Sequence, residues 1–317
     1  MSSWVDRWTR RDVLQAGALA GAASILSPFA VSHAAEQRAL ITRPIPSSGE
    51  QLPVVGLGTN NYSVTAAEEL AARRVVLEKM PQLGGKLIDT APAYGRSEEV
   101  IGELLAQIGN RDRFFLATKA TAPNNDVAEG KAQIERSFER LRTERIELIQ
   151  VHSLTGVDVL VPLLQELKGA KRIKYVGATT SDDGQHAAMA GAMRKHKLDF
   201  VQLNYSIDDR EAAQSLLPLA QERGIAVLVN LPFGGRRGSN LFARVSARPL
   251  PAWASEFDAT SWAQFFLKYV VSHPAVTCAI PGTTKISHLE DNQLGARGRV
   301  PDASMRKRME AFWDELS

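Results

Sequence analysis

The chain has 317 residues, 44% of them hydrophobic, and a formal net charge of +3. This length can bury one large core, so one α/β barrel and two smaller domains both fit it. The 38 basic residues are dispersed among 35 acidic ones, which argues against a nucleic-acid partner and favours a small molecule. The single cysteine, Cys278, excludes an intramolecular disulfide and is predicted to be a buried structural thiol. No motif predicts a metal site.

The first 34 residues have the order of an export signal. Thr9-Arg-Arg-Asp-Val-Leu14 is basic, residues 16–26 are small and apolar, and Ser32-His-Ala34 offers small residues for cleavage. This order resembles a twin-arginine (Tat) signal peptide, cut after Ala34, and implies transient contact with the Tat export machinery and a periplasmic mature protein. A retained membrane anchor is the alternative, although the apolar run is short for a span. The fold is therefore predicted for residues 35–317.

A predicted hairpin, with extended runs at residues 39–42 and 51–54, precedes a regular alternation of apolar and amphipathic segments. The apolar runs predict buried strands at residues 54–57, 87–88, 114–117, 148–151, 175–178, 200–203, 225–229 and 276–280. The amphipathic segments predict helices near residues 66–80, 98–108, 127–141, 159–168, 185–196, 210–223, 262–271 and 303–316.

Eight such units predict an α/β fold, a (β/α)8 TIM barrel preceded by an N-terminal β-hairpin. A doubly wound open sheet is the alternative. It would want a glycine-rich turn after the first strand, and Gly56-Leu-Gly58 lacks the third glycine. Residues 231–259 have no helical or strand periodicity and are predicted to form a long functional loop, with a surface insertion as the alternative.

Polar residues follow three successive predicted strands. They are Asp89 with Tyr94, then Lys119, then His152. The carboxyl ends of parallel strands meet at one barrel mouth, so these side chains are expected to converge there. Each alone has a commoner explanation as a cap, a packed ring, a solvated cation or a core histidine, but their shared position favours a catalytic site. Ser97-Glu-Glu99 is predicted to begin the next helix, with Ser97 as its cap.

The four side chains fit one piece of chemistry. A tyrosine hydroxyl has a pKa near 10 in water, too high for efficient proton donation at neutral pH. The Lys119 ammonium is expected to stabilise the Tyr94 phenolate, and Asp89 is expected to keep that ammonium charged and oriented. His152 is expected to donate a hydrogen bond to a substrate carbonyl oxygen as that oxygen gains negative charge. The set therefore predicts a site that protonates an oxygen during hydride transfer.

With these residues in place, the chain resembles the aldo-keto reductase superfamily from the hairpin to residue 292. The motifs that carry the resemblance are Gly56-Leu-Gly-Thr59, Asp89-Thr-Ala-Pro-Ala-Tyr-Gly95, Ala117-Thr-Lys119, Val151-His152 and Ile280-Pro-Gly-Thr-Thr-Lys285 with Glu290-Asp-Asn292. The resemblance implies a catalytic tetrad of Asp89, Tyr94, Lys119 and His152, and NADP(H) as cofactor, with NAD(H) not excluded. It implies cofactor contacts at Gly58, Thr59, Thr179, Thr180, Gln202, Asn230, Leu231, Pro232, Gly282, Thr283, Lys285, His288, Asp291 and Asn292.

Three positions depart from the family's usual pattern. Thr180 stands where the family has an asparagine, and a hydroxyl cannot offer an amide's donor and acceptor pair. Asn230 stands where an aromatic ring stacks on the nicotinamide, and His288 where an arginine often meets the 2′-phosphate. Apolar walls are usual around small ligands, so Tyr62, Leu154, Phe233 and Trp253 are predicted to line the substrate pocket.

The leading hypothesis is an exported NAD(P)H-dependent reductase of aldehydes or ketones, an EC 1.1.1-like enzyme, acting as a monomer or weak oligomer. Thr180 and Asn230 keep open an alternative, a cofactor-binding sensor or interaction module with little turnover. A sugar-processing or isomerase barrel that uses Asp89 with a second carboxylate is a third interpretation, and it predicts no NADPH binding.

Overall fold

The computed structural model describes residues 38–235 and 240–316, so the predicted signal peptide lies outside the described residues. Across these two ranges no helix combines the length and the apolar character needed to cross a membrane.

Eight parallel strands form one sheet in the order β3 to β10. Their bounds are β3 Leu57–Gly58, β4 Leu87–Asp89, β5 Phe115–Ala120, β6 Ile146–Val151, β7 Ile173–Thr179, β8 Phe200–Asn204, β9 Ala226–Asn230 and β10 Val276–Ala279. The first and last strands meet, because bridges pair Val55 with Ala279 and Gly58 with Gly282. A Cβ atom on Gly58 would lie 2.9 Å from the Ile280 carbonyl oxygen, so only glycine permits this approach. The predicted (β/α)8 barrel is confirmed.

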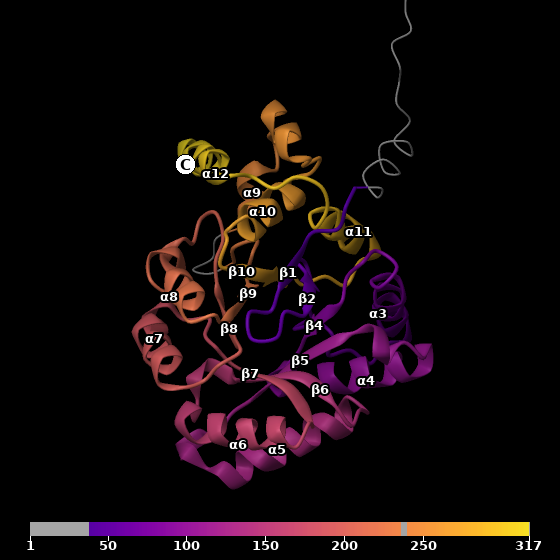
Figure 1. The fold of residues 1–317 in the computed structure, drawn as a ribbon. Helices are drawn as coiled ribbons and strands as arrows, with labels where there is room; N and C mark the ends of the chain where they lie inside the picture. The colour runs from indigo at the N-terminus through magenta and orange to yellow at the C-terminus, as the bar shows by residue number, and fades with distance from the viewer. Residues whose placement is uncertain (1–37, 236–239, 317) are drawn as a thin grey trace, which may run out of the picture. The chain divides into compact units, whose positions relative to one another are not determined.

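Helices surround the strands (Figure 1). They are α3 Ala67–Lys79, α4 Ser97–Ile108, α5 Val127–Arg140, α6 Val157–Gly169, α7 His186–Lys195, α8 Leu216–Glu222, α9 Leu241–Val245, α10 Trp262–Val271, α11 Ile286–Leu294 and α12 Ala303–Glu315. Their apolar faces pack on the outward-facing residues of the strands, which include Ile88, Leu116 and Val201. This packing buries the outside of the barrel.

The single helix predicted at residues 210–223 is wrong. The structure has a 3-10 turn, Glu211–Gln214, followed by α8, and Ser215 between them has φ −140°. Pro218 accounts for the break, since it has no N–H and its ring would clash with the carbonyl of residue 214 in a continuous helix.

Residues 231–259 hold more structure than the sequence predicts. Asn240 caps α9 by accepting a hydrogen bond from the Ala243 amide at 3.1 Å, and a 3-10 segment follows at Ala252–Phe257.

Ser97 is not the cap that was predicted for α4. It is the first residue of that helix, and the capping position belongs to Arg96, which makes no side-chain capping bond.

A hairpin of β1 Thr42–Pro44 and β2 Gln51–Pro53 lies across the centre of the barrel in Figure 1. Ile45 and Leu52 pack with the interior residues Phe115 and Phe200, which are the first residues of their strands. The hairpin therefore closes the amino-terminal end of the barrel and leaves the opposite end open. The predicted N-terminal hairpin is confirmed, with its first strand three residues later than expected.

Glu50, in the hairpin turn, should make the stability of the folded protein depend on pH. Burial opposes its charge, but hydrogen bonds from Lys174, Lys86 and Tyr175 outweigh burial and lower its pKa from 4.5 to about 2. A lowered carboxyl pKa adds stability above the unfolded value, and this stability is lost as the pH falls from about 4.5 toward 2. We expect Glu50→Gln to destabilise the protein at pH 7 and to flatten the pH dependence of its urea midpoint below pH 5. Glu78→Gln, which removes an exposed ion pair to Arg74, is the matched control.

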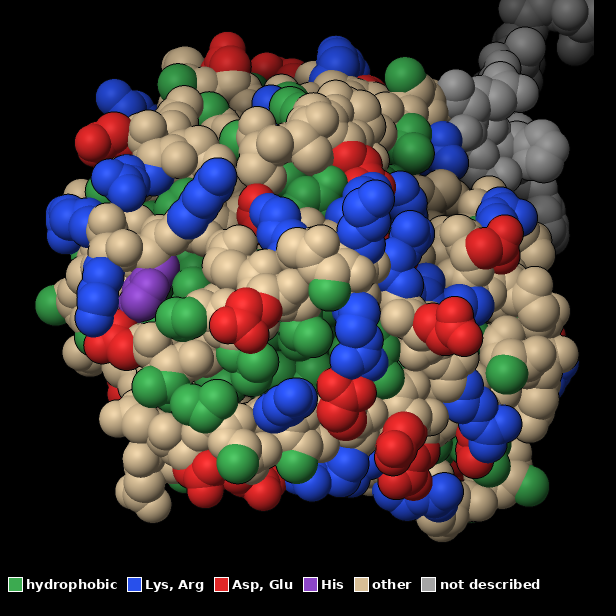
Figure 2. Space-filling model, turned by 60° about the horizontal axis from the view of Figure 1, so that its bottom comes forward, with side chains coloured by type: hydrophobic (Ala, Val, Ile, Leu, Met, Phe, Trp, Pro, Cys, Tyr) green, Lys and Arg blue, Asp and Glu red, His purple; other side chains and the backbone are tan. Residues whose placement is uncertain are grey.

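Basic and acidic side chains lie next to one another over the face shown in Figure 2. Their charges therefore offset one another locally on this face, and the sequence-based prediction that the partner is a small molecule stays a prediction.

Candidate active site

Side chains along each strand point alternately into and out of the barrel, and this alternation places polar side chains inside its open end. In β5, Phe115 and Ala117 point inward beside the hairpin, whereas Leu116 points outward to the helices. Lys119 therefore points inward near the carboxyl end of β5. Asp89, the last residue of β4, reaches the inside by the same alternation and lies beside Lys119.

Lys119 and Asp89 form a buried ion pair, with Nζ 2.7 Å from Oδ2 and side chains 1% and 3% exposed. The ammonium also donates to the Thr90 carbonyl at 2.9 Å and to the Tyr94 hydroxyl at 3.2 Å. Burial would lower the pKa of Lys119, but its interactions with the Asp89 carboxylate and the Tyr94 hydroxyl outweigh burial and raise it above its ordinary value. Lys119 thus stays a cation at physiological pH.

Tyr94 ends a short 3-10 turn, Pro92–Tyr94, between β4 and α4. Pro92 fixes the backbone of the first position, and the ring returns over Lys119 with Nζ 4.9 Å from its centroid. Burial raises the pKa of the Tyr94 phenol, and the charge of Lys119 opposes that rise. The Lys119 cation therefore makes this phenol a better acid than burial alone would allow.

His152 directly follows β6, and its ring meets Tyr94 edge to face, with centroids 6.2 Å apart. Burial and the nearby Lys119 cation lower the pKa of His152 to about 4. The imidazole is therefore neutral at pH 7, and its ring N–H can donate a hydrogen bond without adding charge.

Gln150 belongs to this cluster, although the sequence analysis gave it no role. Its amide nitrogen lies 2.9 Å from Oε1 of Gln202 and 3.5 Å from Oδ1 of Asp89. The available signal was the alternation in β6, which places Gln150 on the same inward face as the apolar Leu148. A polar residue on an otherwise apolar inward face needs partners, and here they are catalytic and cofactor-site candidates.

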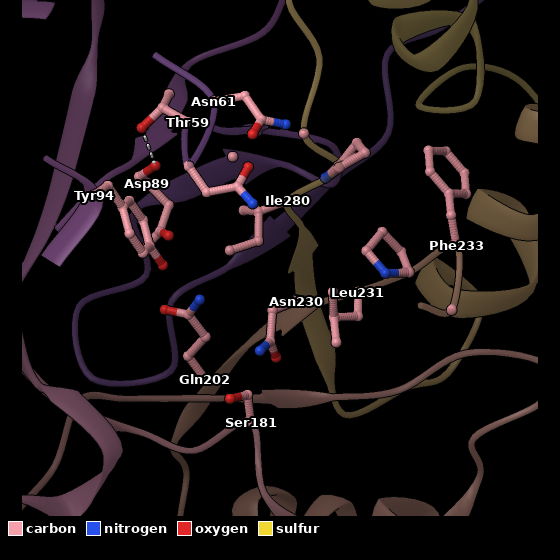
Figure 3. Close-up of a pocket in the computed structure, with 16 residues that line it drawn as sticks. Thr59, Asn61, Asp89, Tyr94, Ser181, Gln202, Asn230, Leu231, Phe233 and Ile280 are labelled. Carbon is pink, nitrogen blue, oxygen red and sulfur yellow. Dashed lines mark hydrogen bonds between the residues drawn. The ribbon is translucent and has the colours of Figure 1, made fainter. Parts of the chain in front are cut away.

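A cavity of about 410 Å³ opens beside Tyr94 and Asp89. Figure 3 shows these two residues on one side and Phe233 on the opposite side, with Asn230 and Leu231 between them. The lining residues are Gly58, Thr59, Asn60, Asn61, Asp89, Tyr94, Ser181, Gln202, Asn230, Leu231, Pro232, Phe233, Gly234, Ile280, Pro281 and Gly282.

A second cavity, of about 430 Å³, adjoins the first, since Phe233 and Gly282 line both. Its other lining residues are Phe242, Ser261, Trp262, Ala263, His288, Asp291 and Asn292. The two neighbouring cavities, here called the groove, lie between Tyr94 and α11; amide side chains line the first and aromatic rings line the second.

Four of the predicted cofactor residues do not line these two cavities. Thr180 donates to Gln185 at 2.7 Å, and Thr179 accepts from the Ser153 amide at 3.1 Å. Thr283 accepts from the Lys285 amide at 3.2 Å. The three hydroxyls therefore hold the loops that frame the groove, and Lys285 is exposed at the start of α11.

The predicted substrate-pocket residues are not together in the structure. Phe233 lines both cavities, and Leu154 is partly buried against the core beside His152. Tyr62 is fully buried, with its hydroxyl 3.2 Å from the Thr283 carbonyl oxygen, and Trp253 packs against Phe265. Neither of these last two lines the cavity beside Tyr94.

Asn60, Asn61 and Ser181 line the first cavity, although the sequence analysis did not select them. All three come within three residues of a strand end, which is the position that selected Asp89 and Lys119. Within residues 38–235 and 240–316, no group of three or more His, Cys, Asp or Glu side chains is placed to hold a metal ion.

Comparison with known proteins agrees with this geometry. Methylglyoxal reductase YeaE of Escherichia coli K12 is 29% identical over 258 residues, which cover 78% of this chain and 87% of YeaE. The aldo-keto reductase YhdN of Bacillus subtilis 168 is 30% identical over 201 residues, 58% of this chain and 60% of YhdN. A Klebsiella pneumoniae aldo-keto reductase, solved in complex with NADPH, shares the fold with a TM-score of 0.72 at 23% identity, covering 87% of this chain and 96% of that one. The model of the aldo/keto reductase family matches residues 54–313, and the chain therefore belongs to that family.

Proposed function

We propose that the protein is an NAD(P)H-dependent oxidoreductase that reduces an aldehyde or ketone to an alcohol. One observation carries the proposal. The Tyr94 hydroxyl lies 3.2 Å from the ammonium of Lys119, which is itself buried against Asp89, and Tyr94 faces a cavity large enough for a small ligand. A phenol held against a buried cation gives up its proton more readily than the same phenol buried alone, because the cation stabilises the phenolate.

The groove fits a nicotinamide dinucleotide. Asn230 lines the first cavity, and its buried Oδ1 atom has no hydrogen-bond partner among the residues that the structure describes, so a ligand amide there would satisfy it. Gln202 offers a second amide in the same cavity, and the rings of Trp262 and Phe242 in the second cavity suit an adenine. NADPH is bound in the solved Klebsiella relative, and His288 in the second cavity would lie near a 2′-phosphate.

The reduced nicotinamide, when bound, supplies a hydride to the carbonyl carbon. Tyr94 gives its proton to the carbonyl oxygen as that oxygen gains negative charge, and the product is an alcohol. Lys119 stabilises the phenolate that Tyr94 becomes, while Asp89 keeps the ammonium in place. His152, neutral above pH about 4, orients the carbonyl by donating a hydrogen bond to the same oxygen.

The direct test mixes purified protein with NADPH and a panel of aldehydes and ketones in a stopped-flow instrument. Loss of NADPH absorbance that depends on the carbonyl supports the proposal. NADPH binding without oxidation by any carbonyl would favour the sensor, and absence of binding would reject both. Comparing the rates of NADPH oxidation among the aldehydes and ketones would also identify the substrate class.

We also propose that the protein is exported by the Tat route and works in the periplasm. The proposal rests on the sequence of residues 1–34, which resembles a Tat signal. Proteins exported by the Tat route cross the membrane already folded, and an enzyme that must bind NADPH inside the cell, where NADPH is made, would need such a route. The mature chain would keep its first barrel contacts, since Arg38 lies beyond the cut and donates to the Asp258 carbonyl at 3.2 Å.

Replacing Arg10 and Arg11 with lysine should retain the precursor inside the cell. We expect the retained protein to be folded and active, because both arginines precede residues 54–313, the part of the chain that the family model matches. Fractionation followed by immunoblotting measures the effect, with Arg7→Lys as a control that leaves the arginine pair intact. Normal export of the double variant would overturn the assignment of the signal.

A further inference from the structure

We propose that Ser97 and Glu98 are positioning residues that hold Tyr94 at bonding distance from Lys119. The inference rests on the proposed function, because it concerns the proton donor of that reaction. Both residues are fully buried at the start of α4, three and four positions after Tyr94. Their side-chain hydrogen bonds go to Thr59, Thr90 and Thr118, so we argue their influence through the strands that they bind.

Ser97 joins the ends of two strands. Its hydroxyl donates to the Thr59 carbonyl at 2.9 Å, just after β3, and lies 2.9 Å from the hydroxyl of Thr90, just after β4. The Thr59 hydroxyl in turn donates to the carbonyl of Asp89 at 2.8 Å. These bonds explain why Ser97 does not cap α4, since its hydroxyl is turned back to the strands.

Glu98 joins α4 to the third strand. One of its carboxylate oxygens accepts a hydrogen bond from the Thr118 hydroxyl at 2.6 Å. Thr118 immediately precedes Lys119 in β5, and the two side chains point to opposite faces of the strand. The other carboxylate oxygen of Glu98 makes no hydrogen bond and lies 3.5 Å from Arg140. Burial raises the pKa of Glu98, and Thr118, Ser137 and Arg140 oppose that rise. A carboxyl group buried in this way costs stability, and a role in the site would account for it.

Residues 89–98, here called the frame, therefore surround the ammonium group of Lys119 on several sides. Lys119 binds three of its members, Asp89, the Thr90 carbonyl and the Tyr94 hydroxyl. Ser97 and Glu98 fasten the far end of the frame to the neighbouring strands. If either fastening is lost, the turn that carries Tyr94 is free to move away from Lys119, and a shift of about 1 Å is enough to cost up to a hundredfold in rate.

The test removes each fastening without touching the reacting groups. Ser97→Ala deletes one hydroxyl, and Thr118→Val deletes the donor to Glu98 while keeping the shape of the side chain. Alcohol oxidation with NADP⁺ is followed as a function of pH, because that direction requires the Tyr94 phenolate. We expect kcat to fall about ten- to a hundredfold in both variants, and the pH of half-maximal rate to rise because the phenolate has lost its cation.

Two controls separate positioning from general stability. Thr118→Ser restores the hydroxyl and should restore the pH profile. Thr277→Val removes another buried threonine hydroxyl, which accepts from the Val227 amide at 3.1 Å, away from the frame. It should lower the melting temperature and leave the pH profile unchanged.

Wild-type pH profiles in Ser97→Ala and Thr118→Val would overturn the inference, whatever their melting temperatures. Should Thr118→Val fail to fold, Thr118→Ala, which also removes the hydroxyl that donates to Glu98, takes its place. An inactive wild-type protein would instead reject the proposed function, so the two failures are distinguishable.

Discussion

Replacing Tyr94 with phenylalanine is expected to lower the rate of carbonyl reduction about a hundredfold or more, the size expected for loss of a general acid. The ring that packs against His152 remains, and only the hydroxyl 3.2 Å from Lys119 is lost. Cofactor affinity should therefore stay nearly unchanged. Single-turnover rates with excess NADPH measure the first effect, and quenching of protein fluorescence by NADPH measures the second.

Tyr175→Phe is the matched control for this experiment. Tyr175 also has a buried hydroxyl, but that hydroxyl binds Ser48 and Glu50 at the closed end of the barrel. Its loss should affect stability and not turnover. If Tyr94→Phe retained wild-type turnover, Tyr94 would not be the proton donor, and His152 would become the candidate.

Lys119→Met is expected to move the pH dependence of alcohol oxidation upward by about 1 to 3 units, the usual effect of one opposite charge at close range. The reason is that Lys119 favours the phenolate form of Tyr94, and without it the phenol keeps its proton to higher pH. The rate at pH 7 should fall accordingly. An unchanged pH profile would show that Lys119 only supports the fold.

Stability must be measured in parallel, because this variant removes the cation that is paired with the buried Asp89 carboxylate. Breaking a buried ion pair usually costs about 3–5 kcal/mol, although burial raises the pKa of Asp89 and favours a neutral carboxyl. The double variant Asp89→Asn with Lys119→Met removes both charges and should recover part of that stability. It should not recover the wild-type pH profile.

The barrel was predictable from sequence because buried parallel strands consist of short, continuous runs of apolar residues. The number of strands, their order and the hairpin followed from those runs, but details that depend on single residues did not. Pro218 breaks a segment whose apolar spacing is helical throughout. The helix α11, nine residues long, has only three apolar positions and so gave no strong periodic signal.

The candidate site was predictable where side chains sit directly at strand ends. Asp89, Lys119 and Tyr94 were selected on position, and Lys119 lies within hydrogen-bonding distance of the other two. Gln150 was not selected, because its role depends on which face of the strand it occupies. Ser97 was selected as a helix cap, and only its three-dimensional partners reveal where its hydroxyl points.

The meeting of the first and last strands has a consequence for how the protein matures. Gly58 and Gly282 are paired across that junction, and both line the cavity beside Tyr94. The wall of the cavity is thus built from chain segments made at opposite ends of translation. A nascent chain shorter than 282 residues cannot complete it, however well its earlier strands have paired. We therefore expect the nucleotide to bind only after the last strand of the barrel has been made and paired. A product truncated before residue 282 should not bind the cofactor.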